Sequence, residues 1–359
     1  MKKNILIMVV VLLVALVPLA GCSAPAVQQT NEAPQSTEAP KQGVVEMPAV
    51  EIGYVQMNLT AAYYLEMQKG FDEAERRLPV KLDVLDSQGS VDKQIQHIEN
   101  LIERGVDVIC LDPADAVALE PVVKKAVAAG IIVHGAHNII EGAPTAVTFS
   151  EYNTGQTLGN YAVELLTGRY GKPQGQVALI LGSVGNWVNT QRETGFKDAL
   201  SPYPDIKIVA EEFSNWDPVQ GVTIMENYLT TYPDLDLVYG VSDGFMPSAA
   251  DAVTEAGRED QIFVLSVDGL PAALDQIQDG VGIDGTVVNA AIADGFYQIY
   301  WAYLAGIGIK LPHQIEVHSP FVNNENVAAA KAMLDAMAAN PKTYPFELSQ
   351  TDYMRAMNP

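Results

Sequence analysis

The chain has 359 residues, of which 21 are lysine or arginine and 44 are aspartate or glutamate, so its formal net charge at pH 7 is −23. The sequence shows no basic patch, which argues against nucleic acid and anionic lipid head groups as partners. The length exceeds the roughly 250–300 residues above which a single hydrophobic core usually divides, so two domains are expected.

The first 21 residues have the layout of a secretory signal peptide. Lys2 and Lys3 precede an apolar run at 5–20, and small residues follow it. A membrane-spanning helix needs about 20 apolar residues, so this run is short for one. The letters "LAGC" at 19–22 resemble the lipobox of bacterial lipoproteins. This resemblance implies that Cys22 becomes the lipidated first residue of the mature protein; an ordinary signal peptide before an unmodified cysteine is the alternative.

Residues 22–49 are rich in Pro, Ala, Gln, Thr and Glu and contain few large apolar side chains. Such a segment buries too little surface to offset the entropy of ordering it, so a disordered tether is expected. The second cysteine, Cys110, lies in the apolar run "VDVICLD". We expect it to be a small buried hydrophobic residue.

Short apolar runs alternate with amphipathic segments over the next hundred residues. Strands are expected at 51–57, 80–87, 106–112, 131–136 and 145–150. Helices are expected at 63–78, 91–105 and 119–130. The first of these helices repeats apolar residues three and four apart: Tyr64, Met67, Phe71, Ala74 and Leu78. Strands that alternate with helices of this length predict a parallel sheet with right-handed crossovers.

The same alternation of strands and helices then repeats over residues 176–306. Strands are expected at 176–183, 206–212, 235–243, 262–269 and 283–289. Helices are expected at 189–200, 218–232, 248–257, 271–280 and 291–306. We therefore predict an α/β fold of two doubly wound, Rossmann-like lobes. Ligands of open parallel sheets bind at the carboxyl ends of the strands, so a cleft between the lobes is the expected binding site.

A last helix is predicted at 326–339, outside the two lobes. Its apolar residues Val327, Ala330, Met333 and Met337 are at helical spacing. We expect this face to pack on the outside of a lobe, as part of a C-terminal extension at 325–359.

Nucleotide and metal sites find little support in the sequence. The stretch "GSVGNW" follows a strand but lacks the third glycine of a dinucleotide loop, and no Walker lysine motif occurs. No cofactor is therefore expected. His134 and His137 lie three apart at a strand end and could share a metal. A role for them in a loop or in the ligand cleft is favoured over a metal site.

Two enzymatic alternatives rest on short patterns. The letters "GVSDG" at 240–244 match the G-x-S-x-G nucleophile elbow centred on Ser242, with Asp268 and then His313 or His318 in the order of a hydrolase triad. A glycosidase would need a pair of carboxylates, for which Asp243 and Asp268 are the candidates. Both patterns are short, so we expect the chain not to be an enzyme.

Three segments, at 52–74, 85–115 and 264–280, together resemble the ribose-type periplasmic sugar-binding proteins of ABC transporters. The similarity extends from about Glu51 to Phe321. It implies a periplasmic-binding-protein type I fold whose two lobes are joined by three chain crossings, near Ser150, near Asn289 and near 316–318. The implied N-terminal lobe comprises 50–150 plus 290–316, and the C-terminal lobe 151–289 plus 317–324.

The resemblance also implies the ligand-binding residues. The aromatic pair of the first lobe falls on Tyr63 and Tyr64, and the aromatic residue of the second lobe on Trp216; a flat ring stacks on the apolar face of a sugar. The second-lobe carboxylate falls on Asp268, which can accept hydrogen bonds from two hydroxyls. The hinge amide falls on Asn289. Core packing is the alternative for Tyr64, and capping of the next helix is the alternative for Asp268.

Three positions depart from the family pattern. The first-lobe Asp-Arg pair is replaced here by His137 and Asn138. The second-lobe arginine position falls on Thr190, two residues before Arg192. Ser242 stands before Asp243 where the family often has asparagine. The cleft is therefore expected to bind a hydroxylated ligand, and ribose in particular is not indicated.

The sequence thus predicts an extracytoplasmic, lipid-anchored solute-binding protein. It is expected to capture a sugar or polyol by closure of its lobes and to deliver it to an ABC transporter permease. A receptor that presents a sugar or an autoinducer-like furanose to a sensor is the alternative among binding proteins, because it has the same fold and cleft. The secretion signal and the missing DNA-binding headpiece exclude a repressor of related fold.

Overall fold

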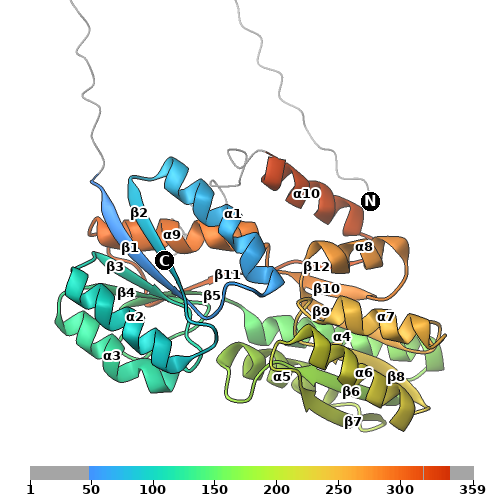
Figure 1. Cartoon of the computed structure of the whole chain (residues 1–359). Coiled ribbons are helices and arrows are strands. Elements are labelled where there is room, and N and C mark those ends of the chain that lie inside the picture. The colour runs from blue at the N-terminus through green and yellow to red at the C-terminus, as the bar shows by residue number, and fades with distance from the viewer. Residues whose placement is uncertain (1–47, 318, 340–359) are drawn as a thin grey trace, which may run out of the picture. The chain divides into compact units, whose positions relative to one another are not determined.

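The computed structural model describes residues 48–317 and 319–339. The described residues belong to one compact unit, Met47–Pro359, which contains two six-stranded sheets (Figure 1). The predicted signal peptide, Cys22 and all but the end of the predicted tether lie outside the described residues. No helix within the described part of the chain is both long and apolar enough to span a bilayer.

The first sheet has the strand order β11-β5-β4-β3-β1-β2, and all its strand pairs are parallel. Its strands are β1 (Val50–Gln56), β2 (Val80–Asp86), β3 (Val108–Leu111), β4 (Ile132–Ala136), β5 (Thr145–Phe149) and β11 (Gln314–Val317). Its helices are α1 (Ala62–Arg77), α2 (Val91–Arg104), α3 (Ala116–Ala128) and α9 (Ala291–Gly306). Buried residues of α1 and α9, such as Phe71 and Phe296, form one core with β1 and β3. Those of α2 and α3, such as Leu101 and Val123, form a second core.

The second sheet has the order β12-β10-β9-β8-β6-β7 and is parallel except for the pair β10–β12. Its strands are β6 (Gly175–Leu181), β7 (Ile206–Phe213), β8 (Leu235–Gly240), β9 (Phe263–Asp268), β10 (Gly285–Val288) and β12 (Phe321–Asn323). Its helices are α4 (Glu151–Tyr170), α5 (Trp187–Leu200), α6 (Pro218–Thr231), α7 (Met246–Glu255) and α8 (Pro271–Asp279). The predicted fold class, two doubly wound α/β units, is confirmed.

The chain passes between the two sheets three times: after β5, after β10, and between β11 and β12. Hydrogen bonds tie these passages together. Ser150 donates its amide to the carbonyl of Val317 (3.0 Å) and its hydroxyl to Glu316 (2.6 Å). Ser319 donates to the side-chain oxygen of Asn289 (2.7 Å). Strand β11 runs to Val317, one residue past the predicted lobe boundary at 316.

Helix α10 (Val327–Ala339) lies against α8, α9 and β12. Its packed face differs from the predicted one. Val327, Ala330 and Leu334 contact the core of the second sheet, whereas Met333 is 41% exposed. Positions 327, 330 and 334 follow the i, i+3, i+7 spacing of one helical face, so Leu334 takes the place assigned to Met333. The side chain of Met337 lies outside the described residues.

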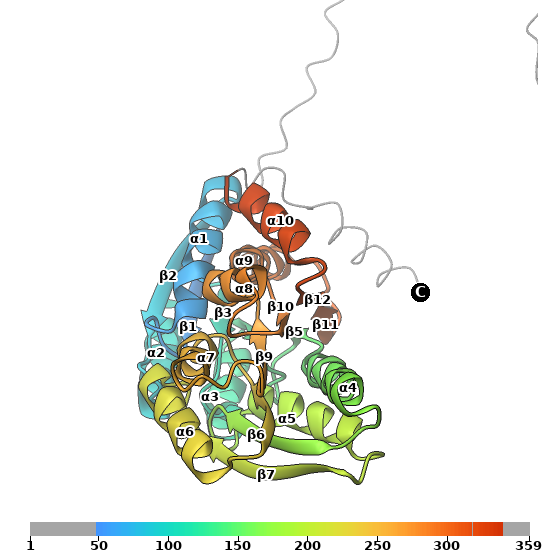
Figure 2. The same ribbon diagram turned by 90° about the vertical axis from the view of Figure 1, so that its right-hand side faces the viewer.

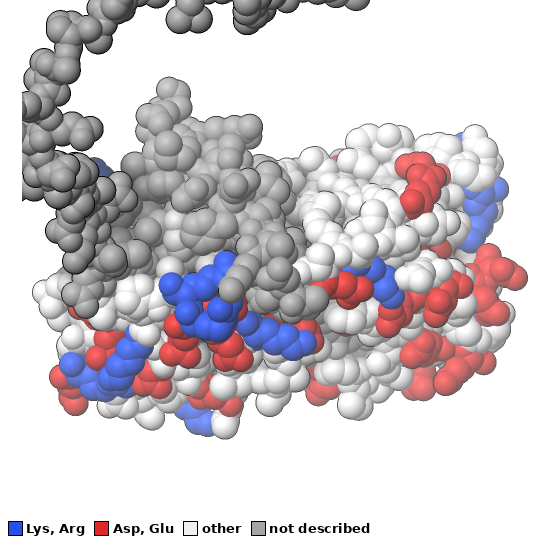
Figure 3. All heavy atoms as spheres, turned by 90° about the horizontal axis from the view of Figure 1, so that it is seen from above, with Lys and Arg blue, Asp and Glu red and all other residues white. Residues whose placement is uncertain are grey.

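Cys110 is fully buried in β3, as predicted. At the surface, lysine and arginine lie beside aspartate and glutamate. Lys69 pairs with Glu66, and Lys81 pairs with Glu51. On the part of the face in Figure 3 that belongs to described residues, lysine and arginine lie among aspartate and glutamate.

Helices α4 and α5 lie side by side (Figure 2) because glycine brings their backbones together. A Cβ at Gly155 would lie 2.0 Å from the carbonyl oxygen of Arg192, and one at Gly195 would lie 2.0 Å from that of Tyr152. Backbone cannot yield as a flexible side chain does. The glycines therefore set the spacing of this helix pair.

We expect Gly155→Ala and Gly195→Ala each to lower the free energy of unfolding by at least about 1–3 kcal/mol, the usual cost of overpacking. Gly168→Ala, in the same helix α4, is the matched control, because nothing lies within 4 Å of its new Cβ. It should raise stability by up to about 1 kcal/mol through helix propensity. Urea unfolding of the three variants checks this. Equal effects at 155 and 168 would contradict the role given to the helix contact.

Candidate ligand-binding site

A cavity of about 960 Å³ is lined by residues of both sheets. Several of its residues follow parallel strands: Asp112 comes directly after β3, His137 after β4, and Asp268 ends β9. The cavity therefore lies at the carboxyl ends of the strands, where open parallel sheets bind ligands. Of the ten predicted ligand-binding residues, those that line it are Tyr63, Tyr64, His137, Asn138, Trp216, Ser242, Asp268 and Asn289.

His137 stands at the centre of the wall built on the first sheet. Its Nε2 lies 2.6 Å from Asp294 Oδ2, and its Nδ1 lies 3.5 Å from Asp112 Oδ2. Tyr63 donates its hydroxyl to the same Asp294 oxygen (2.9 Å), and the Gln56 amide donates to Asp112 (3.1 Å). The imidazole and both carboxylates are buried. This wall thus holds one imidazole between two acids.

His134 lies in β4 and His137 directly follows it, and the pKa values of these two buried histidines shift in opposite directions. Burial alone would lower the pKa of His137, but the carboxylates of Asp294 and Asp112 outweigh burial and hold the pKa well above 6.5. Both ring nitrogens face carboxylate oxygens, which only accept hydrogen bonds, so the geometry also favours the imidazolium form. Burial lowers the pKa of His134 to about 4, and the hydrogen bond between its ring and Gln298 (3.2 Å) opposes this shift without cancelling it. His134 is therefore neutral.

These shifts predict opposite dependences of stability on pH. The contribution of His134 is present above pH 6.5 and is lost as the pH falls toward 4, by about 3 kcal/mol in all. The contribution of His137 is present below pH 6.5 and is lost as the pH rises through its raised pKa. We expect the free energy of unfolding to fall less between pH 6.5 and pH 4 in His134→Gln than in the parent protein. Urea unfolding of both proteins at the two pH values checks this, and identical pH dependences would contradict it.

Arg192 joins two carboxylates in the wall built on the second sheet. Its Nη2 lies 3.0 Å from Glu151 Oε1, and its Nη1 lies 3.0 Å from Asp268 Oδ1. Ser242 donates to the other oxygen of Asp268 (2.6 Å), and the amide of Asn289 donates to Oδ1 (3.2 Å). Burial raises the pKa of Asp268, and Arg192 and Ser242 oppose that rise without cancelling it.

Trp216 lies directly before α6 in a turn of unusual backbone geometry. Asn215 and Trp216 both have left-handed φ angles, 53° and 62°, and Asp217 caps the helix by accepting from the amides of Val219 and Gln220. A Cβ at Gly182 would fall 2.2 Å from the Trp216 ring. The indole therefore packs on backbone that glycine leaves bare, and it forms part of the cavity wall.

Two predicted site residues do not line the cavity. Thr190 is exposed, and its hydroxyl donates to the carbonyl of Asn186 in its own helix (2.9 Å). Arg192 lines the cavity instead. Asp243 is buried behind the wall, where it accepts from the amide of Leu270 (2.9 Å). Burial, and then the charge of Asp268, raise the pKa of Asp243 to about 8.

The charged lining residues that were not among the predicted ones are Asp86, Asp112, Glu151, Arg192 and Asp217, and Asp294 lies behind the lining, in contact with His137. Asp112 follows a strand just as Asp268 ends one, so the strand-end rule could have found it. Glu151 and Asp294 belong to α4 and α9, which begin at two of the chain crossings. No local motif marks these two residues.

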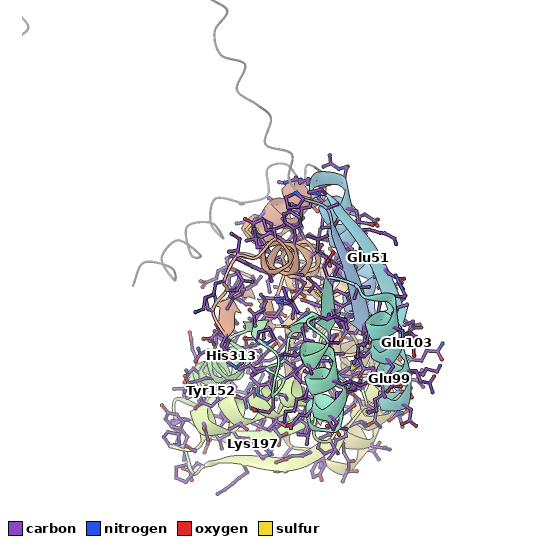
Figure 4. The ribbon with its side chains drawn as sticks, turned by 90° about the vertical axis from the view of Figure 1, so that its left-hand side faces the viewer. Glu51, Glu99, Glu103, Tyr152, Lys197 and His313 are labelled. Carbon is purple, nitrogen blue, oxygen red and sulfur yellow. The ribbon has the colours of Figure 1, made fainter. Side chains whose placement is uncertain are left out.

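The enzymatic and metal alternatives gain no geometric support within residues 48–317 and 319–339. Ser242 donates to Asp268, and His313 is exposed directly before β11 (Figure 4). His318 lies outside the described residues. His134 and His137 contact Gln298 and carboxylates, and no three described His, Cys, Asp or Glu residues form a group able to hold a metal ion.

Comparison with known proteins identifies the same architecture. Residues 52–310 match the family described as periplasmic binding protein domain. The D-allose-binding periplasmic protein of Escherichia coli K12 is 26% identical over 239 residues, which cover 65% of this chain and 77% of that protein.

Two solved structures of ABC transporter solute-binding proteins are also similar. One, from Mycobacterium smegmatis with bound glycerol, has a TM-score of 0.74 and 29% identity, and the match covers 79% of this chain and 96% of that one. The other, from Bacillus halodurans with bound myo-inositol, has a TM-score of 0.74 and 25% identity, with coverage of 80% and 99%.

Proposed function

Because this chain belongs to the periplasmic binding protein family, we propose that it binds a sugar or polyol outside the cytoplasm and delivers it to an ABC importer. The observation that carries the proposal is the cavity itself. Carboxylates, amides and aromatic rings from two sheets meet in it, and these are the groups that recognise a ring bearing hydroxyls. The related solute-binding proteins were solved with glycerol and myo-inositol.

The mechanism is closure of two lobes on the ligand, with no bond made or broken. The three passages between the sheets, tied at Ser150, Asn289 and Ser319, would serve as the hinge. Tyr63 and Trp216 belong to different sheets, so a ligand that contacts both favours the closed form. Closure is then a population shift set by how much more tightly the closed form binds.

A thermal-shift screen of the full chain against pentoses, hexoses, furanoses and polyols tests this function. A true ligand at about 100 times its Kd adds about 2.7 kcal/mol of stability, a clear rise in melting temperature. Asp268→Asn should reduce the rise, because the amide cannot accept from hydroxyls at both atoms. Stabilisation by none of these compounds, or turnover of glycosides or esters, would contradict the proposal.

We further propose that Cys22 carries the lipid that anchors the protein at the outer side of a membrane. More than one acyl chain gives a stable anchor. We expect Cys22→Ser to move the protein from the membrane fraction to the soluble fraction, as measured by fractionation and immunoblotting. A variant that stays membrane-bound with an uncleaved N-terminus would show instead that residues 5–20 act as a transmembrane anchor.

A further inference from the structure

The cavity wall built on the first sheet, called the first wall below, carries more negative than positive charge. Asp112 and Asp294 share a single partner of opposite sign, the imidazole of His137, at 3.5 and 2.6 Å. Both nitrogens of that ring are occupied by these contacts. With His137 protonated, the three groups together keep one negative charge.

The cavity wall built on the second sheet, called the second wall below, has the same excess of negative charge, carried by different residues. Glu151 and Asp268 share the guanidinium of Arg192, whose Nε, Nη1 and Nη2 are all used on carboxylates. The side chains of the three groups are at most 5% exposed. This wall therefore also keeps one negative charge.

The other described residues that line the cavity add negative charge and no further lysine or arginine. Asp86 and Asp217 add two partly buried carboxylates to the lining, and Arg192 is the only lysine or arginine among the described lining residues. The ligand thus enters a space whose fixed charge is negative on both sides.

The carboxylates paired with His137 and Arg192 are already buried, so a neutral ligand would leave their excess charge uncompensated in a space that closure cuts off from water, which is costly. A positively charged ligand would compensate it, most strongly where water is excluded. Aromatic rings on the same cavity, those of Tyr64, Phe149 and Trp216, offer faces that also attract a cation. The two observations, charge and aromatic lining, point to the same ligand chemistry.

We propose that the ligand is an amino sugar or amino polyol, whose protonated amine lies near Asp112, with the charge of Asp294 directly behind His137, and whose hydroxyls meet the second wall. This inference rests on the proposed function, because it specifies the class of sugar or polyol that the same cavity binds. A primary ammonium supplies three donors and no acceptor, which suits carboxylates that only accept.

Matched pairs of compounds test the proposal by isothermal titration calorimetry on the full chain. The pairs are D-glucosamine with D-glucose, D-galactosamine with D-galactose, and an amino-deoxy inositol with myo-inositol. N-acetyl-D-glucosamine controls for size without charge. In at least one pair, we expect the amine to bind at least tenfold more tightly than its neutral partner.

Variants that each remove one negative charge show which residues cause the preference for the amine. Asp112→Asn and Asp294→Asn should each reduce the amine preference at least fivefold, since each leaves the first wall without net charge. Glu103→Gln is the matched control. It removes one negative charge from the exposed surface of α2 (Figure 4), and it should leave the preference unchanged.

The outcomes separate the two levels of inference. If neutral sugars or polyols bind and no amine is preferred, the ligand class is wrong and the sugar-binding function stands. If amines are preferred but Glu103→Gln reduces the preference as much as Asp112→Asn does, general surface charge is the cause and the proposed contact is wrong. If no compound binds, both the proposed function and this inference fail.

Discussion

Replacing Arg192 by leucine is expected to lower the free energy of unfolding by about 3–5 kcal/mol, the usual cost of leaving a buried charge without its partner. The guanidinium holds Glu151 and Asp268 together at side-chain exposures of 1% and 5%, and its Nη1 also donates to the carbonyl of Val241 (2.7 Å). Without it, two buried carboxylates face each other with no cation between them. Since whole proteins are stable by only about 5–15 kcal/mol, this is a large fraction.

Arg104→Leu is the matched control for this change. Arg104 also bridges two carboxylates, those of Glu51 and Asp83, but its side chain is 41% exposed. Water screens such pairs, so the control should change stability by at most about 1 kcal/mol. Urea unfolding without ligand measures both variants.

A conservative variant keeps the test usable if Arg192→Leu does not fold. Arg192→Lys retains the charge but cannot reach both carboxylates with a planar fork, so an intermediate loss is expected. Adding Asp268→Asn to Arg192→Leu should recover part of the stability, because one uncompensated charge is removed. Equal losses for Arg192→Leu and Arg104→Leu would contradict the view that the buried network holds this wall.

The strands and helices could be predicted from sequence because their cause is local. Alternating apolar runs such as 106–112 and 262–269 become β3 and β9, and Gly105, with a left-handed φ of 68°, ends α2. The lining of the cavity could be predicted where it depends on strand ends. His137, Ser242 and Asp268 follow or end strands, and parallel strands bring these positions to one edge.

The two predicted residues that do not line the cavity differ from their lining neighbours in side-chain direction. Residues two apart on a helix point about 200° apart, so Thr190 faces solvent when Arg192 faces the cavity. Asp243 follows Ser242 directly, and only Ser242 reaches the cavity. A resemblance at low identity fixes which helix or loop carries a position but not its register to within two residues.

Asp294 could not be predicted because its role depends on packing. It lies in α9, more than 150 residues from His137 and more than 200 from Tyr63, and it meets both only when α9 packs beside α1. No spacing in the sequence encodes that contact. The excess of negative charge on the first wall could therefore be identified only from the folded structure.

The largest losses of ligand affinity are expected from truncating the aromatic side chains on opposite walls. Tyr63, from α1, and Trp216, before α6, both line the cavity. A stacked ring contributes about 0.5–1.5 kcal/mol beyond its buried area. We expect Trp216→Ala and Tyr63→Ala each to raise the Kd of an identified ligand at least tenfold, which is about 1.4 kcal/mol. Calorimetric titration measures both.

Conservative variants separate the ring from its other roles. Tyr63→Phe keeps the ring and loses the hydrogen bond to Asp294, so it should cost much less affinity than Tyr63→Ala. Trp216→Phe should retain part of the stacking. Gly182→Ala should weaken binding without touching the ligand, because its new Cβ would displace the Trp216 ring.

The double variant Tyr63→Ala, Trp216→Ala tests whether both rings grip one ligand in the closed form. If they do, the loss in the double variant should differ from the sum of the single losses, since either truncation already loosens closure. Tryptophan emission should change on ligand addition in the parent protein and much less in Trp216→Phe, while Trp301, which is 3% exposed, reports little in either. Additive losses would mean that the rings act independently. Unchanged affinity in both single variants would place the ligand away from this cavity, because no ligand held between the two walls could leave both rings without contact.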